Sequence, residues 1–253
     1  MDARLTEKNR QPLGKGVFVR VSPHHTFGTD AVLLAHFSAA RQKDRLVDLG
    51  TGCGIIPLLL LRDGLTQNAV GVDISPEAIR LAKQSAAENG FENLTFVESD
   101  LNELKGKVVF GEHTLVTCNP PYKAPTGGIQ NADLTVAAAR HEIFCTLEDI
   151  VSVAARLLRP SGRFCCCHRP ERLAELMAVM TDYDIAPKRL RLVCQRLGEA
   201  PWLVLVEGRR CGKTGLRIEP TLYIEENGAL SAEMKAIYGC YKEEHESCRE
   251  NSM

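Results

Sequence analysis

Aromatic residues and long hydrophobic runs are both scarce in this chain. Phe, Trp and Tyr together make up 6% of the 253 residues, and the longest apolar run, Ile55 to Leu61, contains a proline. A transmembrane helix needs about 20 consecutive apolar residues, and the first residues lack the apolar core of a signal peptide. We therefore expect a cytoplasmic protein that contacts no membrane.

Cysteine pairs with metal-binding spacing are missing as well. The ten cysteines include no C-x-x-C pair, and Cys165, Cys166 and Cys167 are consecutive in an apolar segment. Neighbouring residues of a strand point to opposite faces, so three in a row cannot converge on one metal ion. The sequence predicts reduced, buried thiols and no metal site.

An excess of one charge sign is absent from the chain as a whole, whose formal net charge is −1. With 44% hydrophobic and 25% charged residues, the composition is that of a globular domain and excludes collagen-like, coiled-coil and disordered proteins. Basic residues nevertheless gather in two segments, with five Lys or Arg against two acids in 1–20 and eight against two in 188–217. Such a surface can hold the phosphates of RNA. A solvated face without a partner is the alternative.

Strand-like and helix-like segments alternate from about residue 45 onward. Predicted strands cover 45–49, 69–74, 94–97, 114–118, 163–168, 189–195 and 202–207, and predicted helices cover 55–62, 76–89, 147–158 and 170–180. This order predicts an α/β fold with a Rossmann-like, seven-stranded, mostly parallel sheet and an antiparallel terminal hairpin. We expect 1–240 to form one domain on which 1–44 pack as an extension, with 241–253 as a frayed tail.

A glycine-rich turn follows the first predicted strand. The pattern Asp48-x-Gly50-x-Gly52-x-Gly54 leads into a helix, and its glycines allow a sharp bend and the close approach of a ligand. Its spacing differs from the G-x-G-x-x-G of dinucleotide sites, and the lysine of a phosphate-binding P-loop is missing. A tight turn without a ligand is the alternative.

Acidic residues stand at the ends of the next two predicted strands. Asp73 ends the second strand, where a carboxylate can accept hydrogen bonds from ribose hydroxyls, and Asp100 ends the third. The carboxyl ends of parallel strands meet at one sheet edge, where ligands bind. With Asp48, these acids predict one ligand site, and solvated loop acids are the alternative.

The fourth predicted strand leads into Asn119-Pro120-Pro121-Tyr122. An amine conjugated to a ring or carbonyl is a poor nucleophile, because its lone pair is delocalised. The Asn119 side-chain oxygen and the Pro120 carbonyl can accept its two N–H groups and favour a pyramidal nitrogen. The two prolines stiffen the turn, and Tyr122 can stack on a flat substrate, so positioning and electrostatics suffice without a strong base. A rigid turn is the alternative.

These motifs resemble the class I methyltransferases that use S-adenosylmethionine (SAM). LVDLGTGCG is similar to their first motif and VGVDIS to their second, while NPPY is similar to the motif of amino methyltransferases acting on adenine N6, cytosine N4, guanine N2 or glutamine N5. The resemblance implies SAM as cofactor, with the ribose at Asp73, the adenine amino group at Asp100 and the methionine part beside the glycines.

A narrower resemblance covers about residues 12–240. FGTDAVLL at 27–34, Ala139-Arg140-His141 and the basic stretch ending in Tyr238-Gly239 look like the tRNA adenine-N6 methyltransferase family, whose described members modify adenine 37 of a valine tRNA. It implies methyl transfer from SAM to N6 of an adenine in RNA, with tRNA as the expected substrate.

The two resemblances together imply three sets of site residues. The cofactor-binding set is Thr29, Asp30, Asp48, Gly50, Thr51, Gly52, Gly54, Asp73, Ile74, Asp100, Leu101 and Asn119. The catalytic set is Asn119, Pro120, Pro121 and Tyr122, and the substrate-binding set is Tyr122, Arg140, Lys188, Arg189 and Arg191. The 24 residues between Tyr122 and Leu147 are expected to form a substrate-facing loop.

Two other functions stay open at this point. Protein N5-glutamine methyltransferases share both motifs, but they usually carry a separate helical N-terminal domain, for which residues 1–44 are too few. A SAM-binding adaptor without catalysis would not need the NPPY residues. The oligomeric state, monomer or homodimer, is also left open.

Overall fold

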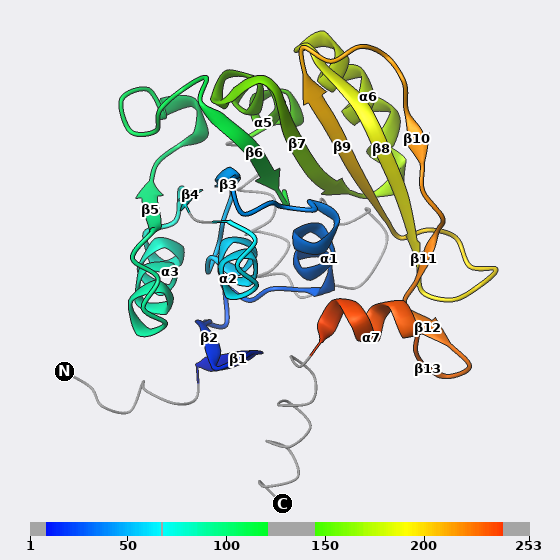
Figure 1. Cartoon of the computed structure of the whole chain (residues 1–253), viewed down its shortest axis with the longest axis horizontal. Coiled ribbons are helices and arrows are strands. Elements are labelled where there is room, and N and C mark those ends of the chain that lie inside the picture. The colour runs from blue at the N-terminus through cyan, green and yellow to red at the C-terminus, as the bar shows by residue number, and fades with distance from the viewer. Residues whose placement is uncertain (1–8, 67, 121–144, 240–253) are drawn as a thin grey trace, which may run out of the picture.

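The computed structural model describes residues 9–66, 68–120 and 145–239 (Figure 1). Its centre is a nine-stranded sheet in the order β10-β8-β9-β7-β6-β3-β4-β5, with β11 also paired to β8. The long strands are β3 Arg45–Leu49, β4 Asn68–Asp73, β5 Leu94–Glu98, β6 His113–Cys118, β7 Leu158–His168, β8 Ile185–Cys194 and β9 Leu203–Arg210.

These seven long strands confirm the predicted Rossmann-like sheet. Two strands of two residues each, β10 Arg217–Ile218 and β11 Leu222–Tyr223, extend it beside β8. The antiparallel strand is β9, which lies between β7 and β8. The last long strand is therefore inside the sheet rather than at its edge.

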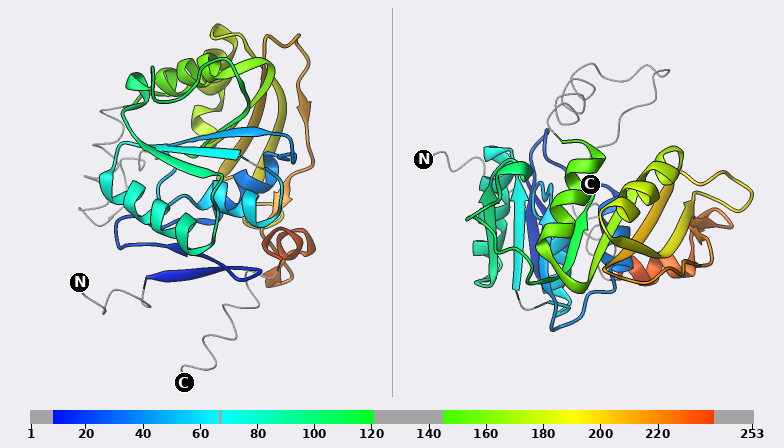
Figure 2. Two further views of the ribbon diagram at one scale, coloured as in Figure 1. Left: turned by 60° about the vertical axis from the view of Figure 1, so that its left-hand side comes forward. Right: turned by 90° about the horizontal axis from the view of Figure 1, so that it is seen from above.

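Helices cover both faces of the sheet (Figures 1 and 2). One face packs against α1 Thr29–Phe37, α2 Ile55–Arg62 and α3 Pro76–Glu88, and the other against α5 Leu147–Leu157 and α6 Leu173–Asp182. Strand β7 serves both cores, because its side chains alternate between the faces. Cys165 and Cys167 belong to the core under α1, and Phe164 and Cys166 to the core under α5.

Local signals explain where two of these helices begin. The Ser75 side chain accepts a hydrogen bond from the Ala78 N–H at the start of α3, with Pro76 in the first turn, where a proline does no harm. Thr146 and Asp149 form a capping box at the start of α5, which satisfies two otherwise unpaired N–H groups.

The regions before β3 and after β9 hold more structure than the sequence pattern predicts. The pattern indicates no element before residue 45, whereas a hairpin of β1 Arg10–Gly14 and β2 Val17–Arg20 packs on α3, followed by α1. The Asn89 side chain holds β2 by accepting from Phe18 N at 2.9 Å and donating to Phe18 O at 2.6 Å. Beyond β11, the chain forms the β12–β13 pair, Glu225–Glu226 and Ala229–Leu230, and helix α7, Ala232–Tyr238.

The described residues contain neither a disulfide bond nor a helix that could span a membrane. Their cysteines are all free thiols, and those of β7 are fully buried. Every helix among them is too short or too polar to span a bilayer.

Candidate functional site

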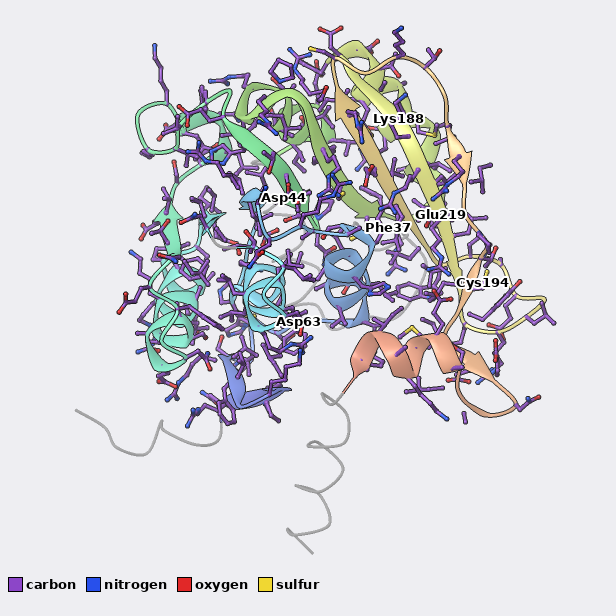
Figure 3. All side chains as sticks on the ribbon, viewed as in Figure 1. Phe37, Asp44, Asp63, Lys188, Cys194 and Glu219 are labelled. Carbon is purple, nitrogen blue, oxygen red and sulfur yellow. The ribbon has the colours of Figure 1, made fainter. Side chains whose placement is uncertain are left out.

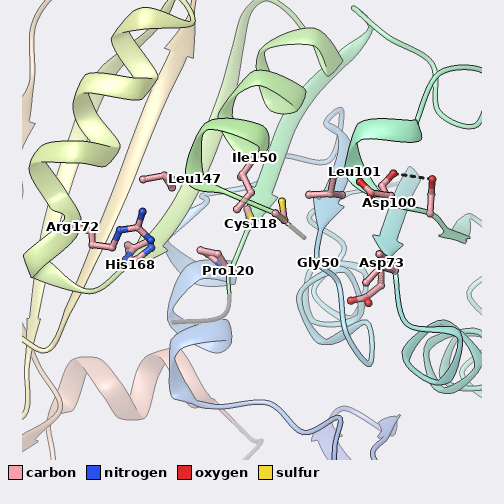
Figure 4. Close-up of a pocket in the computed structure, with 13 residues that line it drawn as sticks. Gly50, Asp73, Asp100, Leu101, Cys118, Pro120, Leu147, Ile150, His168 and Arg172 are labelled. Carbon is pink, nitrogen blue, oxygen red and sulfur yellow. Dashed lines mark hydrogen bonds between the residues drawn. The ribbon is translucent and has the colours of Figure 1, made fainter. Parts of the chain in front are cut away.

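A pocket opens at the carboxyl edge of the sheet, where β3, β4, β6 and β7 end (Figure 4). Six residues predicted for the site line it: Gly50, Asp73, Ile74, Asp100, Leu101 and Pro120. The remaining described lining residues are Ser99, Cys118, Cys145, Leu147, Ile150, His168 and Arg172. Gly50 of the glycine turn and Pro120 of the NPPY motif therefore line one cavity.

The glycine turn follows β3 and has a left-handed backbone at three positions. Gly50, Gly52 and Gly54 have φ angles of +68°, +55° and +84°, a region that residues with a Cβ atom rarely adopt. A Cβ atom on Gly54 would lie 2.9 Å from Phe96 Cζ, whereas one on Gly50 or Gly52 would meet no atom within 4 Å. Gly54 is thus required by packing, and the open side of Gly50 leaves room for a ligand in the pocket.

Asp73, the last residue of β4, ties this turn to the neighbouring strand. Its Oδ2 accepts a hydrogen bond from Gly52 N at 2.8 Å, and its Oδ1 accepts one from Ser75 N at 2.9 Å. A carboxylate oxygen can accept more than one hydrogen bond. Asp73 can therefore hold the turn and still accept from the hydroxyl groups of a ligand.

Asp48 lies beneath the same turn and is 1% exposed. Its Oδ1 accepts a hydrogen bond from Thr117 Oγ1 at 2.6 Å, while its Oδ2 makes no hydrogen bond of ordinary length and angle. Burial raises the pKa of Asp48 to about 7, the hydroxyl groups of Thr117 and Thr51 oppose this rise, and the charge of Asp73 adds to it. Asp48 and the 2%-exposed Thr51 do not line the pocket, so their direct contact with a cofactor stays a prediction.

Asp100, which follows β5, supplies a second acidic group on the same side of the pocket as Asp73. It caps the short helix η2, Leu101–Glu103, by accepting from Asn102 N at 2.8 Å. The apolar side chains of Ile74, which is 41% exposed, and Leu101 lie on the same pocket. A flat heterocycle with an amino group fits between two apolar side chains and a carboxylate, so these residues suit the adenosine part of SAM.

Asn119 and Pro120 follow β6 directly. Pro120 lines the pocket, whereas the half-buried side chain of Asn119 lies against β7, where its Oδ1 accepts a hydrogen bond from Cys167 Sγ at 3.0 Å. Pro121, Tyr122 and Arg140 lie outside the described residues, as does most of the predicted substrate-facing loop. Their predicted roles stay predictions.

His168 and Arg172 form an end of the pocket that the sequence motifs do not indicate. In Figure 4 they lie on the other side of Pro120 from Asp73 and Asp100. Burial lowers the pKa of His168 to about 4, and its Nδ1 accepts from Arg169 N at 2.8 Å. The imidazole is therefore neutral near pH 7, with its proton on Nε2. Its position at the carboxyl end of a strand, like that of Asp73, is the signal that could have identified it.

The predicted substrate-binding residue Arg189 is engaged within the protein. Its guanidinium lies 3.0 Å from Glu207 Oε2 and 3.4 Å from Glu219 Oε1, and it stacks on the Phe37 ring at 4.4 Å from the centroid. Figure 3 shows Phe37 and Glu219 near β8. The charge of Arg189 is thus largely offset inside the fold.

Four other predicted contacts also lie outside the pocket lining. The Arg191 guanidinium is 2.7 Å from Glu233 Oε1, and Lys188 donates to the Lys213 carbonyl. Thr29 Oγ1 is 2.9 Å from the Tyr238 hydroxyl, and Asp30 Oδ1 accepts from Ala31 N at 2.9 Å. Their contacts with RNA or SAM stay predictions.

Comparisons with known proteins agree with this arrangement. A family profile described as a methyltransferase domain matches residues 40–203, more than half of the chain. The chain is 28% identical over 189 residues to a protein of Aeromonas hydrophila named tRNA1(Val) (adenine(37)-N6)-methyltransferase, covering 74% of this chain and 78% of that protein. It is 29% identical over 192 residues to a Porphyromonas gingivalis protein of the same name, covering 72% and 73%.

Solved structures resemble the fold. A predicted O-methyltransferase from Agrobacterium tumefaciens superposes with a TM-score of 0.67 at 20% identity, covering 83% of this chain and 95% of the other. At that identity the likeness concerns the fold alone. Together with the matched profile and the pocket built on the glycine turn, it leads to one conclusion: the chain belongs to the family of methyltransferase domains.

Proposed function

We propose that this protein transfers a methyl group from SAM to the exocyclic N6 amine of an adenine in tRNA. The observation that carries the proposal is the shared pocket, which has Gly50, Asp73 and Asp100 on one side and Pro120 between them and His168. The names of the curated relatives support adenine in tRNA as the substrate.

The cofactor side of the pocket suits SAM residue by residue. Asp73 would accept from the ribose hydroxyls, Asp100 would accept from the adenine amino group, and Ile74 and Leu101 would contact the adenine ring. Gly50 would face the methionine part, where its missing side chain leaves space. When bound, SAM supplies an electrophilic methyl group on its sulfonium.

The amine side would be prepared by Asn119 and Pro120. An adenine inside a helix has to leave its stack before its N6 amine can enter such a pocket. The Asn119 Oδ1 and the Pro120 carbonyl would accept its two N–H groups and favour a usable lone pair. Neither group is basic, so the proton of the methylated amine would pass to water.

RNA is the proposed substrate class rather than protein. The relatives named above are tRNA enzymes, and segments 1–20 and 188–217 carry an excess of basic residues. Their phosphate contacts are part of the proposal, as is a cytoplasmic location. Glutamine methylation and a non-catalytic adaptor have less support, since an adaptor would not need an amine-binding motif at its cofactor pocket.

The proposal is tested by offering the protein labelled SAM with either total RNA or total protein from a bacterial extract. Digestion of the labelled RNA to nucleosides should place the label in N6-methyladenosine. A valine tRNA transcript with adenine 37 replaced by guanine serves as the matched control. Label in glutamine, or in a nucleoside other than N6-methyladenosine, would contradict the proposed substrate, whereas equal labelling of the original and the variant transcript would place the modified adenine at a position other than 37.

A further inference from the structure

The side chains of Asn119 and Cys167 meet across two neighbouring parallel strands. Cys118 of β6 is paired in register with Cys166 of β7, so the next residues, Asn119 and Cys167, also lie side by side. Cys167 is 0% exposed, and its Sγ donates to Asn119 Oδ1 at 3.0 Å. A buried strand residue thus touches the amide that the proposed reaction uses.

We propose that Cys167 is a positioning residue, which fixes the Asn119 amide with its oxygen directed for the target amine. This inference rests on the proposed methyl transfer to an amine. An amide has oxygen on one side and NH2 on the other, and rotation about its terminal bond exchanges them. With the NH2 group presented, N–H would face N–H and the amine would lose an acceptor.

The chemistry of the thiol explains why Cys167 favours the orientation of the Asn119 amide in which its oxygen is directed for the target amine. The S–H group is a donor, and an amide oxygen can accept two hydrogen bonds. The oxygen that accepts from Cys167 can therefore also accept from the amine. Because Cys167 is held in the packed core of the sheet, it favours this orientation before substrate arrives, which lowers the cost of ordering Asn119 during binding.

The chain supplies a matched control in Cys165. It lies on the same strand and the same face as Cys167, belongs to the same core and is also 0% exposed. Its sulfur approaches Glu207 Oε2 at 3.9 Å, and Glu207 is on β9, which pairs with β7 on the side away from β6. Cys165→Ala and Cys167→Ala remove the same atoms from equally buried positions, but only the second removes the donor to Asn119.

The experiment measures kcat, the KM for RNA, SAM affinity by calorimetry and thermal unfolding for the wild type and both alanine variants. Cys167→Ala should lower kcat about fivefold to tenfold relative to Cys165→Ala, as expected for one hydrogen bond. SAM affinity should stay within about twofold of the wild type, and Cys167→Ser should recover part of kcat. Equal kcat for the two alanine variants would overturn the proposal.

A second comparison uses a side chain at position 119 whose two terminal atoms are the same, so that its orientation no longer matters. In Asn119→Asp the side chain carries oxygen at both positions, so Cys167→Ala should change kcat less than about twofold in that background. The same loss in both backgrounds would show that Cys167 acts through packing. Should the alanine variants unfold, the same comparison can be made with Cys165→Ser and Cys167→Ser. Of these two variants, Cys167→Ser should show the smaller loss of kcat. A wild type that methylates no amine would instead defeat the proposed function.

Discussion

The Oδ2 atom of Asp73 accepts a hydrogen bond of 2.8 Å from the backbone N–H of Gly52. Two motifs about twenty residues apart in the sequence are thereby joined at the pocket. The acid has a structural task in shaping the turn and a proposed task in holding ribose, and its other oxygen is held by Ser75 N at 2.9 Å.

Asp73→Asn should weaken SAM binding roughly tenfold to hundredfold. An amide has one acceptor oxygen, so its NH2 group would face the N–H of Gly52 or Ser75. Calorimetry measures the loss. Glu77→Gln is the control, because Glu77 lies in the first turn of α3 with a side chain 43% exposed. Equal changes in the two variants would show that Asp73 has no special contact with SAM or the turn.

Gly54→Ala should destabilise the fold more than Gly64→Ala. Both glycines have positive φ, +84° and +66°, but only at Gly54 would the added Cβ come within 2.9 Å of Phe96 Cζ. The backbone conformation costs about 1–2 kcal/mol in both variants, and overpacking adds about 1–3 kcal/mol at Gly54. Urea unfolding gives the difference, and equal free energies would mean that Phe96 moves aside freely.

Asp48→Asn should change how stability depends on pH. Since the pKa of Asp48 is raised from 3.8 to about 7 in the folded protein, the folded state keeps a proton that the unfolded state loses between these values. The stabilising contribution of Asp48 to the free energy of unfolding is therefore fully present below pH 4 and falls as the pH rises toward 7. Relative to Asp48→Asn, the wild type should lose on the order of 2 kcal/mol between pH 5 and pH 8.

The free energies of unfolding of wild type and variant at several pH values test this sign. Buried histidines such as His113 and His168 have lowered pKa values, so the protein loses stability as the pH falls. This opposite trend is the same in wild type and variant, and it cancels when one free energy of unfolding is subtracted from the other. A difference that stays constant from pH 5 to pH 8 would show that Asp48 titrates in its ordinary range.

Most of the sheet and half of the pocket could be predicted because their signals are local. Apolar runs mark the long strands, and Asp73, Asp100 and Pro120 each follow such a run, so the parallel sheet brings them to one edge. Hairpin β1–β2 escapes prediction because its anchor, Asn89, is 71 residues from Phe18. The partners of Arg189 could not be predicted for the same reason, since Glu207 and Glu219 are brought next to it only by strand pairing.

Arg189→Gln should lower stability by about 1–3 kcal/mol, because Glu207 is 5% exposed and would lose a partner. Arg217→Gln is the control, since the Arg217 side chain is 72% exposed and also pairs with Glu219, and exposed pairs contribute about 0–1 kcal/mol. Thermal unfolding separates the two. A loss of RNA affinity without a loss of stability in Arg189→Gln would instead support the predicted phosphate contact.

The most direct test of the account combines two readouts on Asn119→Ala: single-turnover methyl transfer to tRNA and SAM affinity by calorimetry. Asn119 belongs to both the catalytic and the cofactor-binding set, but Gly50, Asp73 and Asp100 line the pocket and would hold most of SAM. In Asn119→Ala, transfer should therefore fall by at least about a hundredfold while SAM affinity stays within about threefold of the wild type. Loss of both together, or transfer at the wild-type rate, would contradict the claim that this pocket brings an amine held by Asn119 and Pro120 to the methyl group of SAM.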